Sequence, residues 1–347
     1  MPTTRLGIAT AALLTAASIA VGACGASTDG ANEGPEEPET EGITVYSGRI
    51  PAAIGGAVDA YEADAGRDVQ VRFADTADLA ATLVEEGDAS PADVYFAQEP
   101  GAIGAVADEG LLAELPEDIL ERVPAKFRDP EGRWVGVTAR VRVLAYGEDV
   151  PKSDLPDSPL DLSDPMYEGR VGWGPVTSTL QQYVTVLRLE QGEDVARDWL
   201  EAMVANGAVD YPDNVAIRDA IANGEIDLGL LNHYYVAQAI AAEGDDYPVE
   251  LFYQPDDFGS LILLTSVGVL ESSERKEEAF DFIGSLLSDE SQSYFTESSK
   301  EYPVAKGVEA DRSLEVALAA IPSPGGDPTD ITEIQATVEL MQETGAL

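Results

Sequence analysis

The sequence has little of two residue types that often carry chemistry: its 347 residues include one cysteine, Cys24, and one histidine, His233. A single cysteine cannot form an internal disulfide. Without further thiolates or a second imidazole, a zinc site is not expected. The sequence also lacks an HExxH motif, a Walker loop, a dinucleotide-binding glycine fingerprint and a Gly-x-Ser-x-Gly elbow. These absences argue against several common classes of enzyme.

Basic residues are scarce as well. The chain has 20 lysines and arginines against 65 aspartates and glutamates, a formal charge of −45, and five of the basic residues are lysines. Such a surface repels nucleic acid and anionic lipid head groups, so neither is an expected partner. It fits either a saline habitat or the ordinary solubility of an exported protein. With 44% hydrophobic residues, the chain can still form two domains with real cores.

The N-terminus carries an export signal. An apolar run that ends at Val21 is followed by small residues and Cys24. This pattern predicts a signal peptide over residues 1–23 and resembles the bacterial lipobox, which implies lipidation of Cys24. The alternative is a secreted protein in which Cys24 falls there by chance. Residues 24–42 are predicted to be a disordered acidic tether. We therefore expect a lipoprotein at the outer face of the cytoplasmic membrane.

Strands and helices alternate in the next part of the chain. The predicted elements are a strand at 43–46, a helix at 51–66, a strand at 69–73, a helix that stops at Gly87 and a strand at 94–97. This alternation indicates a parallel sheet with helices on its faces. Later elements are two strands at 133–137 and 141–146, a loop at 149–169, strands at 171–174 and 226–231, a helix at 277–295 and a tail helix at 331–343. The fold class is therefore α/β.

Four predicted strands end in polar groups, at residues 47–49, 98–99, 177–179 and 232–235. In open α/β sheets, ligands bind outside the carboxyl ends of the strands. The strand at 226–231 is followed by Asn232, His233, Tyr234 and Tyr235. Adjacent residues of a strand point to opposite faces, so both tyrosines can meet one ligand only if the backbone turns there.

A tyrosine pair suits a hard metal ion. A trivalent ion such as ferric iron stabilises the phenolate form of a side chain whose free pKa is about 10. The alternative for Tyr234 and Tyr235 is ordinary packing at a strand end. We interpret His233 as a structural hydrogen-bonding group beside this site rather than as a ligand or a base.

Two arginines and three hydroxyl side chains could bind an anion. Arg140 and Arg142 share a strand face by the period of two, and guanidinium groups bind small oxyanions in a bidentate manner. Thr177, Ser178 and Thr179 precede a predicted helix, whose N-terminus favours an anion. The alternative for these hydroxyls is simple N-capping.

The order and spacing of these pieces resemble the bacterial ferric-iron-binding substrate-binding proteins of ABC importers, within the type II periplasmic-binding-protein superfamily. The matching segments span most of 43–305: Ile43–Arg49, Ser90–Val94, Trp134–Tyr146 with Arg140 and Arg142, Gly169–Trp173, Asn223–Asp227, Asn232–Tyr235 and Glu301–Pro303. The resemblance implies a two-lobed α/β fold with the ligand cleft between the lobes. It implies a discontinuous lobe 1 (43–139 and about 262–320), a lobe 2 (140–261) and a C-terminal tail and helix (321–347).

The resemblance also implies a function. Fe(III) would be held by Tyr234 and Tyr235 together with carbonate or phosphate as a synergistic anion, and a monomer would deliver it to an ABC permease. The side chains that would bind the anion or support the site are Arg140, Arg142, Thr177, Ser178, Asn214, Asn232, Ser47 and Gln98.

The first-lobe ligand departs from the family pattern. Some members have a histidine or tyrosine where this chain has Ile50, and some have a glutamate where it has Gln98. Glu99 is therefore the predicted third ligand, and the alternative is that solvent or anion oxygens fill the coordination shell. Another subgroup uses a tyrosine after the polar turn, where this chain has Gln181. Two alternatives remain open. The same fold could bind a non-iron anion or a small organic solute, or the chain could be an extracytoplasmic hydrolase that uses His233.

Overall fold

The computed structural model describes residues 42–254, 258–311, 314, 316–323 and 334–347. They belong to one compact unit, Thr40–Leu347. The predicted signal peptide, Cys24 and most of the predicted tether lie outside the described residues, as do residues 331–333 of the predicted tail helix. Among the described residues, no helix has both the length and the apolar character needed to span a membrane.

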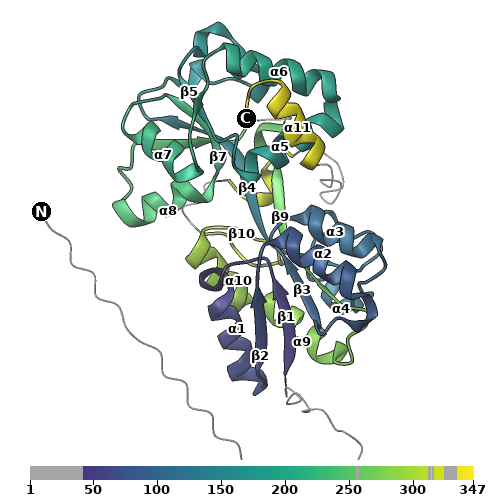
Figure 1. Cartoon of the computed structure of the whole chain (residues 1–347). Helices are drawn as coiled ribbons and strands as arrows, with labels where there is room; N and C mark the ends of the chain where they lie inside the picture. The colour runs from purple at the N-terminus through teal and green to yellow at the C-terminus, as the bar shows by residue number, and fades with distance from the viewer. Residues whose placement is uncertain (1–41, 255–257, 312–313, 315, 324–333) are drawn as a thin grey trace, which may run out of the picture. The chain divides into compact units, whose positions relative to one another are not determined.

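The described strands form one sheet, ordered β2-β1-β3-β9-β4-β7-β5-β6, with β8 and β10 paired to β4. Figure 1 shows how β4 and β9 connect two groups of elements. We call the half built on β1, β2 and β3 lobe 1 and the half built on β5, β6 and β7 lobe 2. The strands are β1 (Ile43–Ser47), β2 (Val69–Phe73), β3 (Val94–Ala97), β4 (Val135–Gly147), β5 (Val171–Trp173), β6 (Val209–Asp210), β7 (Leu228–Asn232), β8 (Val249–Phe252), β9 (Ile262–Val269) and β10 (Tyr302–Pro303).

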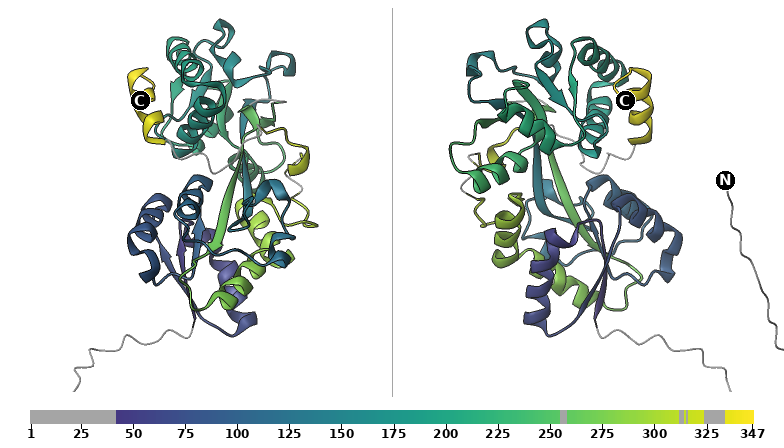
Figure 2. Two further views of the ribbon diagram at one scale, coloured as in Figure 1. Left: turned by 90° about the vertical axis from the view of Figure 1, so that its right-hand side faces the viewer. Right: turned by 60° about the vertical axis from the view of Figure 1, so that its left-hand side comes forward.

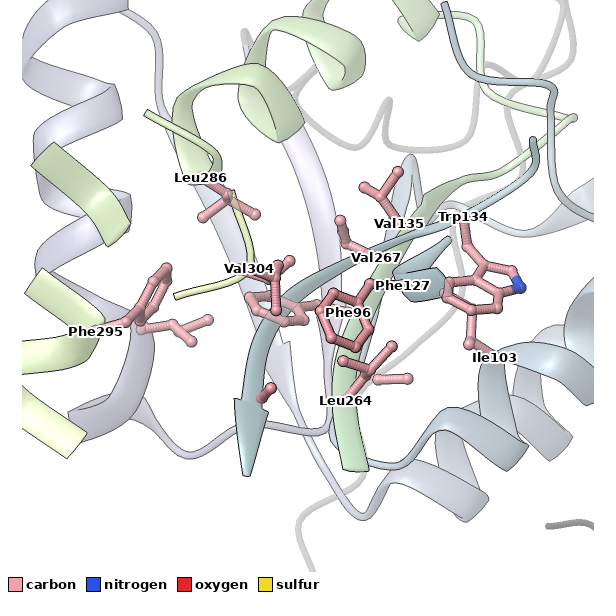
Figure 3. Close-up of a cluster of buried hydrophobic side chains, with 14 of the residues drawn as sticks. Phe96, Ile103, Phe127, Trp134, Val135, Leu264, Val267, Leu286, Phe295 and Val304 are labelled. Atoms are coloured by element: carbon pink, nitrogen blue, oxygen red, sulfur yellow. The ribbon is translucent and has the colours of Figure 1, made fainter. Parts of the chain in front are cut away.

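Lobe 1 has the predicted parallel start, since β1 pairs in parallel with both β2 and β3. Its helices are α1 (Pro51–Ala65), α2 (Thr76–Glu86), α3 (Pro100–Asp108), α4 (Glu117–Leu120), α9 (Lys276–Leu286) and α10 (Asp289–Ser299). They cover the sheet because each buries an apolar stripe, such as Leu79 and Leu83 of α2. In Figure 3, Phe96 of β3, Leu264 of β9 and Phe127, which precedes β4, lie in one buried cluster.

Lobe 2 has a core of its own. Its helices are α5 (Ser178–Gln191), α6 (Glu193–Ala205), α7 (Asn214–Ala222), α8 (Tyr234–Glu243) and α11 (Ile334–Glu343). The Trp199 ring makes edge contacts with Trp173 and Tyr183, with ring centroids 6.0 and 5.8 Å apart. The two views of Figure 2 place α11 beside α5, where the Thr185 and Thr337 hydroxyls are 2.7 Å apart. The tail helix is therefore part of this lobe.

The two strands predicted at 133–137 and 141–146 are wrong: residues 135–147 form the single strand β4. The strand is continuous because different partners bond its two ends. It pairs with β9 from Val135 to Val141 and with β7 from Arg142 to Tyr146. The expected linker, residues 138–140, is therefore the middle of the longest strand. Arg140 and Arg142 lie where β4 passes from one lobe to the other.

The single helix predicted at 277–295 is also wrong. It is two helices, α9 and α10, and the Ser288 hydroxyl caps the second by accepting a hydrogen bond from the Ser291 N–H at 3.2 Å. An apolar stripe continued across the break and concealed this cap. The predicted loop at 149–169 contains the short 3₁₀ turns η3 (Lys152–Asp154), η4 (Pro159–Ser163) and η5 (Pro165–Tyr167).

Candidate metal and anion site

The tyrosine pair lies where β7 becomes α8. The strand ends at Asn232, His233 already has helical backbone angles (φ −50°, ψ −39°), and Tyr234 begins the helix. The turn that the sequence required is therefore confirmed. It brings the rings of Tyr234 and Tyr235 to a centroid distance of 4.4 Å, with an interplanar angle of 38°. Both side chains are half-buried.

Tyr235 is held as a neutral phenol in the metal-free protein. Burial raises its pKa, and the adjacent Tyr234 hydroxyl raises it further, while the Arg140 guanidinium acts in the opposite direction. A phenol of this kind ionises at neutral pH only when a strong cation binds its oxygen. The pair is therefore suited to a highly charged, oxygen-seeking metal ion.

His233 fixes this turn and does not face the site as a ligand. It is fully buried; its Nδ1 accepts the Val141 N–H of β4 at 3.1 Å, and its Nε2 lies 3.0 Å from the Lys300 carbonyl oxygen. The two contacts define a neutral ring with the proton on Nε2. Burial lowers the pKa of His233 to about 4. Both nitrogens are occupied, which supports a structural role rather than that of a base.

Arg142 belongs to lobe 2. Its guanidinium is buried, with Nη1 donating to Asn214 Oδ1 at 3.3 Å and Nη2 donating to the Leu230 carbonyl at 2.9 Å. Asn214 Oδ1 also accepts the Asn232 N–H at 3.2 Å. Burial lowers the pKa of Arg142 to about 10, so the group stays charged at neutral pH. Within the described residues, Arg142 Nε and the side-chain amide of Asn232 have no hydrogen-bond partner.

The start of α5 joins the same network. Thr177 is the N-cap, and its hydroxyl accepts the Leu180 N–H at 3.3 Å, so the N-capping alternative is correct for this residue. Asn214 Nδ2 donates to the Thr179 hydroxyl at 3.4 Å. The exposed Ser178 side chain lies beside them. The positive end of α5 and the Arg142 guanidinium therefore both contribute to one anion-favouring corner.

Arg140 contacts the other lobe. Its Nη1 donates to the Gln98 carbonyl at 2.8 Å, and its Nη2 lies 3.9 Å from Glu99 Oε1. Its Nε and Nη2 make no hydrogen bond to any described residue, although the side chain is 1% exposed. Arg140 and Arg142 share a strand face, as predicted, but their bonded partners come from different lobes. A buried guanidinium with free donors favours a small oxyanion beside it.

Arg49 and Glu301 form a buried ion pair that is not predicted as part of the site. Two hydrogen bonds of 2.9 Å join the Arg49 guanidinium to the Glu301 carboxylate, and Arg49 Nη1 also donates to Gln98 Oε1 at 2.9 Å. Burial alone would raise the pKa of Glu301, but Arg49 holds it near 2. Glu301 follows Lys300, whose carbonyl contacts His233. An arginine after the first strand is the signal that could have found this pair in so acidic a chain.

The remaining predicted residues have modest roles in the structure. The Ser47 hydroxyl accepts the Arg49 N–H at 3.1 Å and so stabilises the turn after β1. Ile50 is 67% exposed at the start of α1. Among the described residues, no group of three histidine, cysteine, aspartate or glutamate side chains could hold a metal. Any metal at this place would therefore depend on the tyrosine oxygens.

The chain is similar to several known proteins in sequence and in fold. The chain is 31% identical to the Fe(3+)-binding periplasmic protein of Serratia marcescens over 311 residues, which is 88% of this chain and 91% of that protein. It superposes on iron-bound HitA from Pseudomonas aeruginosa with a TM-score of 0.78 and 34% identity, covering 87% of this chain and 99% of that one. A Trichodesmium protein (IdiA, FutA) in complex with iron and citrate gives a TM-score of 0.76 at 25% identity, with 88% and 99% covered.

The predicted two-lobed α/β fold of the periplasmic-binding type is confirmed by these structures. The model of the family described as bacterial extracellular solute-binding protein matches residues 89–323. That match runs from before β3 to beyond β10 and so includes the tyrosine pair and both arginines of β4. The chain belongs to the bacterial extracellular solute-binding protein family.

Proposed function

We propose that this protein captures ferric iron together with a small anion and delivers it to the permease of an ABC importer. The observation that carries the proposal is the Tyr234–Tyr235 pair, held with ring centroids 4.4 Å apart at the β7–α8 turn. Two relatives described above are named for ferric or bound iron. Two phenolates supply two negative charges to a trivalent ion in a half-buried place, where opposite charges attract strongly.

Glu99 completes the protein ligands in this proposal. Its carboxylate comes from lobe 1, is 26% exposed and lies 3.9 Å from Arg140. Hinge motion about β4 and β9 would bring it toward the tyrosines, with lobe 1 as 43–139 and about 262–320 and lobe 2 as 140–261. The closed state would be favoured because iron contacts both lobes only there.

The anion occupies the remaining positions on the metal. Arg140 Nε and Nη2, Arg142 Nε and the Asn232 amide are polar donors without hydrogen-bond partners in the described part of the chain. Thr177, Ser178 and Asn214 surround the start of α5. Carbonate and phosphate are small enough to bridge these donors and the metal. Citrate, present in the Trichodesmium complex, is the larger anion to compare.

We also propose a location for the protein at the outer face of the cytoplasmic membrane. Cleavage before Cys24 and lipidation of that residue would anchor a monomer to the outer face of the cytoplasmic membrane through its lipid and its acidic tether. The membrane contact is made by the lipid alone. Mass spectrometry of protein from membranes would find a diacylated Cys24 at the N-terminus, and an unmodified N-terminus elsewhere would refute the anchor.

Ferric loading tests the function. The iron-free protein is mixed with one equivalent of ferric nitrilotriacetate in bicarbonate, in phosphate or in neither, and metal content and visible absorption are measured after gel filtration. We expect one iron per chain and a tyrosinate charge-transfer band in at least one of the two anions. A colourless, iron-free protein in all three conditions would refute the proposal.

The runner-up keeps the fold and replaces iron with a non-metal anion or a small organic solute. This alternative is favoured by Ile50 and Gln98, because some members of the family that the chain resembles have metal ligands at these two positions. Calorimetry with phosphate in the absence of iron separates the two: tight phosphate binding with no iron uptake would support the runner-up. Hydrolysis of ester or phosphate substrates that depends on His233 would support the hydrolase alternative.

A further inference from the structure

A cavity of about 670 Å³ lies next to the proposed iron site. Residues of α2 and α3 in lobe 1 and of α5 and α11 in lobe 2 line it. Its volume is within the range of about 300–1,000 Å³ that is usual for small-molecule sites. Glu99 and Ser178 are on its wall, whereas Tyr234, Tyr235, Arg140 and Arg142 are not among its lining residues. The cavity therefore shares Glu99 and Ser178 with the proposed iron site but not its tyrosines or arginines.

The wall is apolar over much of its area. Small and branched side chains supply this surface: Ala81 and Val84 from α2, Ala102 and Ala105 from α3, and Ile334 at the start of α11. Val84 is 44% exposed, so part of its side chain is open to contact with a ligand. A flat or branched hydrocarbon body would bury these groups, and burial of apolar area favours binding by about 25 cal/mol per Å².

The charged groups of the wall all have one sign. Asp75, Glu85 and Glu99 carry carboxylates, and among the described lining residues none is basic. An anionic ligand would be repelled by these groups, while an uncharged or cationic one would not. In this respect the cavity differs from the Arg140–Arg142 region, which favours anions.

One buried side chain supplies a polar recognition group. Gln182 of α5 lines the cavity and is 1% exposed. Neither its Nε2 nor its Oε1 finds a hydrogen-bond partner in the described ranges of the chain. A buried amide without partners is costly, at about 1–3 kcal/mol, so a ligand that both accepts and donates a hydrogen bond there would relieve this cost.

We propose that this cavity is a second ligand site, for an uncharged or cationic organic molecule with an apolar body and an amide-like polar group. The apolar body contacts α2, α3 and Ile334, and the polar group pairs with the Gln182 amide. This site goes beyond the capture of ferric iron and does not require it. It can therefore be tested on the iron-free protein.

Benzamide is a suitable probe because its ring is apolar and its amide can pair reciprocally with glutamine. Binding of benzamide, benzamidine and benzoate to the iron-free protein is measured by calorimetry in the presence of a metal chelator. We expect benzamide and benzamidine to bind with a Kd of about 1 mM, the strength usual for fragments, and benzoate to bind at least about tenfold more weakly. Equal or stronger binding of benzoate would overturn the charge argument and with it the proposal.

Two variants locate the binding. Gln182→Leu removes the amide and should weaken benzamide by about tenfold, the usual worth of a buried polar contact. Ala81→Phe fills the cavity from an exposed position, so it does not disturb the core, and should abolish benzamide binding. Ala63→Phe, at an exposed position of α1 away from the cavity, is the matched control and should change nothing.

The outcomes separate this proposal from the iron function. If Ala81→Phe binds benzamide as well as Ala63→Phe does, or if no probe binds, the second site is refuted whatever the iron result. If benzamide binds as expected while ferric loading fails, the iron proposal alone is refuted.

Discussion

The two halves of the candidate site differ in how firmly their groups are held. In lobe 2, Tyr234 and Tyr235 follow His233, whose ring nitrogens are both bonded, and buried Arg142 contacts Asn214. In lobe 1, Ile50 is 67% exposed and the Glu99 side chain is 26% exposed. The lobe 2 groups are held by hydrogen bonds before any ligand arrives, whereas lobe 1 presents one partly exposed carboxylate, that of Glu99.

This contrast would allow the protein to bind iron with only three protein ligands, as proposed above. In the proposed function, groups fixed in advance would lose little conformational freedom on binding, so lobe 2 would supply most of the affinity. Lobe 1 would add a contact that exists only after closure and so would act mainly on the release rate. The Lys300–His233 contact joins the two lobes, and the buried Arg49–Glu301 pair lies within lobe 1, at the residue that follows Lys300.

The largest expected effect comes from breaking the buried Arg49–Glu301 ion pair in lobe 1. Glu301→Gln leaves the buried Arg49 charge without a carboxylate, and we expect the free energy of unfolding to fall by about 3–5 kcal/mol. Urea denaturation measures it. Glu271→Gln, which breaks the more exposed pair with Lys276, is the matched control and should cost less than about 1 kcal/mol. Equal effects of the two variants would refute a structural role for the Arg49–Glu301 pair.

The next effect concerns pH and His233. Its pKa is lowered from 6.5 to about 4 in the folded protein, so the unfolded chain binds the proton first as pH falls. The stability that depends on the neutral ring is complete above pH 6.5 and declines toward pH 4, by about 3 kcal/mol in total. His233→Gln retains a donor and an acceptor but does not titrate.

The measurement for His233 is the difference between two pH profiles. Free energies of unfolding of wild type and His233→Gln are compared from pH 7 to pH 4, where other titrating groups contribute to both. We expect the wild type to lose about 3 kcal/mol more than the variant over this range. Parallel profiles would show that His233 is not buried as a neutral ring.

A smaller effect tests the contribution of Glu99 in lobe 1. Glu99→Gln keeps the size of the side chain but removes its charge, and we expect ferric affinity to fall by about tenfold, or about 1.4 kcal/mol. The tyrosinate band should stay, because its donors are in lobe 2. Competition with a ferric chelator measures the affinity. An unchanged affinity would mean that solvent or the anion, not Glu99, completes the coordination.

The smallest expected effect is an increase in ferric affinity. Ile50→His introduces an imidazole where the family resemblance implies a ligand in some members, and its exposed position should tolerate the change. We expect ferric affinity to rise by less than about tenfold, because ordering the new side chain costs conformational entropy. The same chelator competition measures it. A decrease in affinity would place Ile50 outside the reach of the metal.

Sequence patterns predicted the elements that depend on local periodicity. The strand at 94–97, the capped start of α5 and the turn before Tyr234 follow from short runs of residues. The continuity of β4 did not, because it depends on distant partners, β9 and β7. The helix break at Ser288 was missed because the apolar stripe runs through it.

The site was predictable to the extent that its residues are adjacent or unusual. Tyr234 and Tyr235 are neighbours in sequence, and Arg140 and Arg142 stand out in an acidic chain. The Arg49–Glu301 pair joins residues 252 positions apart. The lack of hydrogen-bond partners for the Gln182 amide among the described residues can be seen only in the folded structure. Neither feature has a local pattern.

The visible spectrum of the ferric-loaded protein tests the central claim most directly, when wild type is compared with the variant that carries both Tyr234→Phe and Tyr235→Phe. The account predicts a charge-transfer band and one iron per chain in the wild type. It predicts the loss of both in the double variant, with an unchanged melting temperature of the iron-free protein. A band of equal strength, or equal iron content, in the double variant would contradict it.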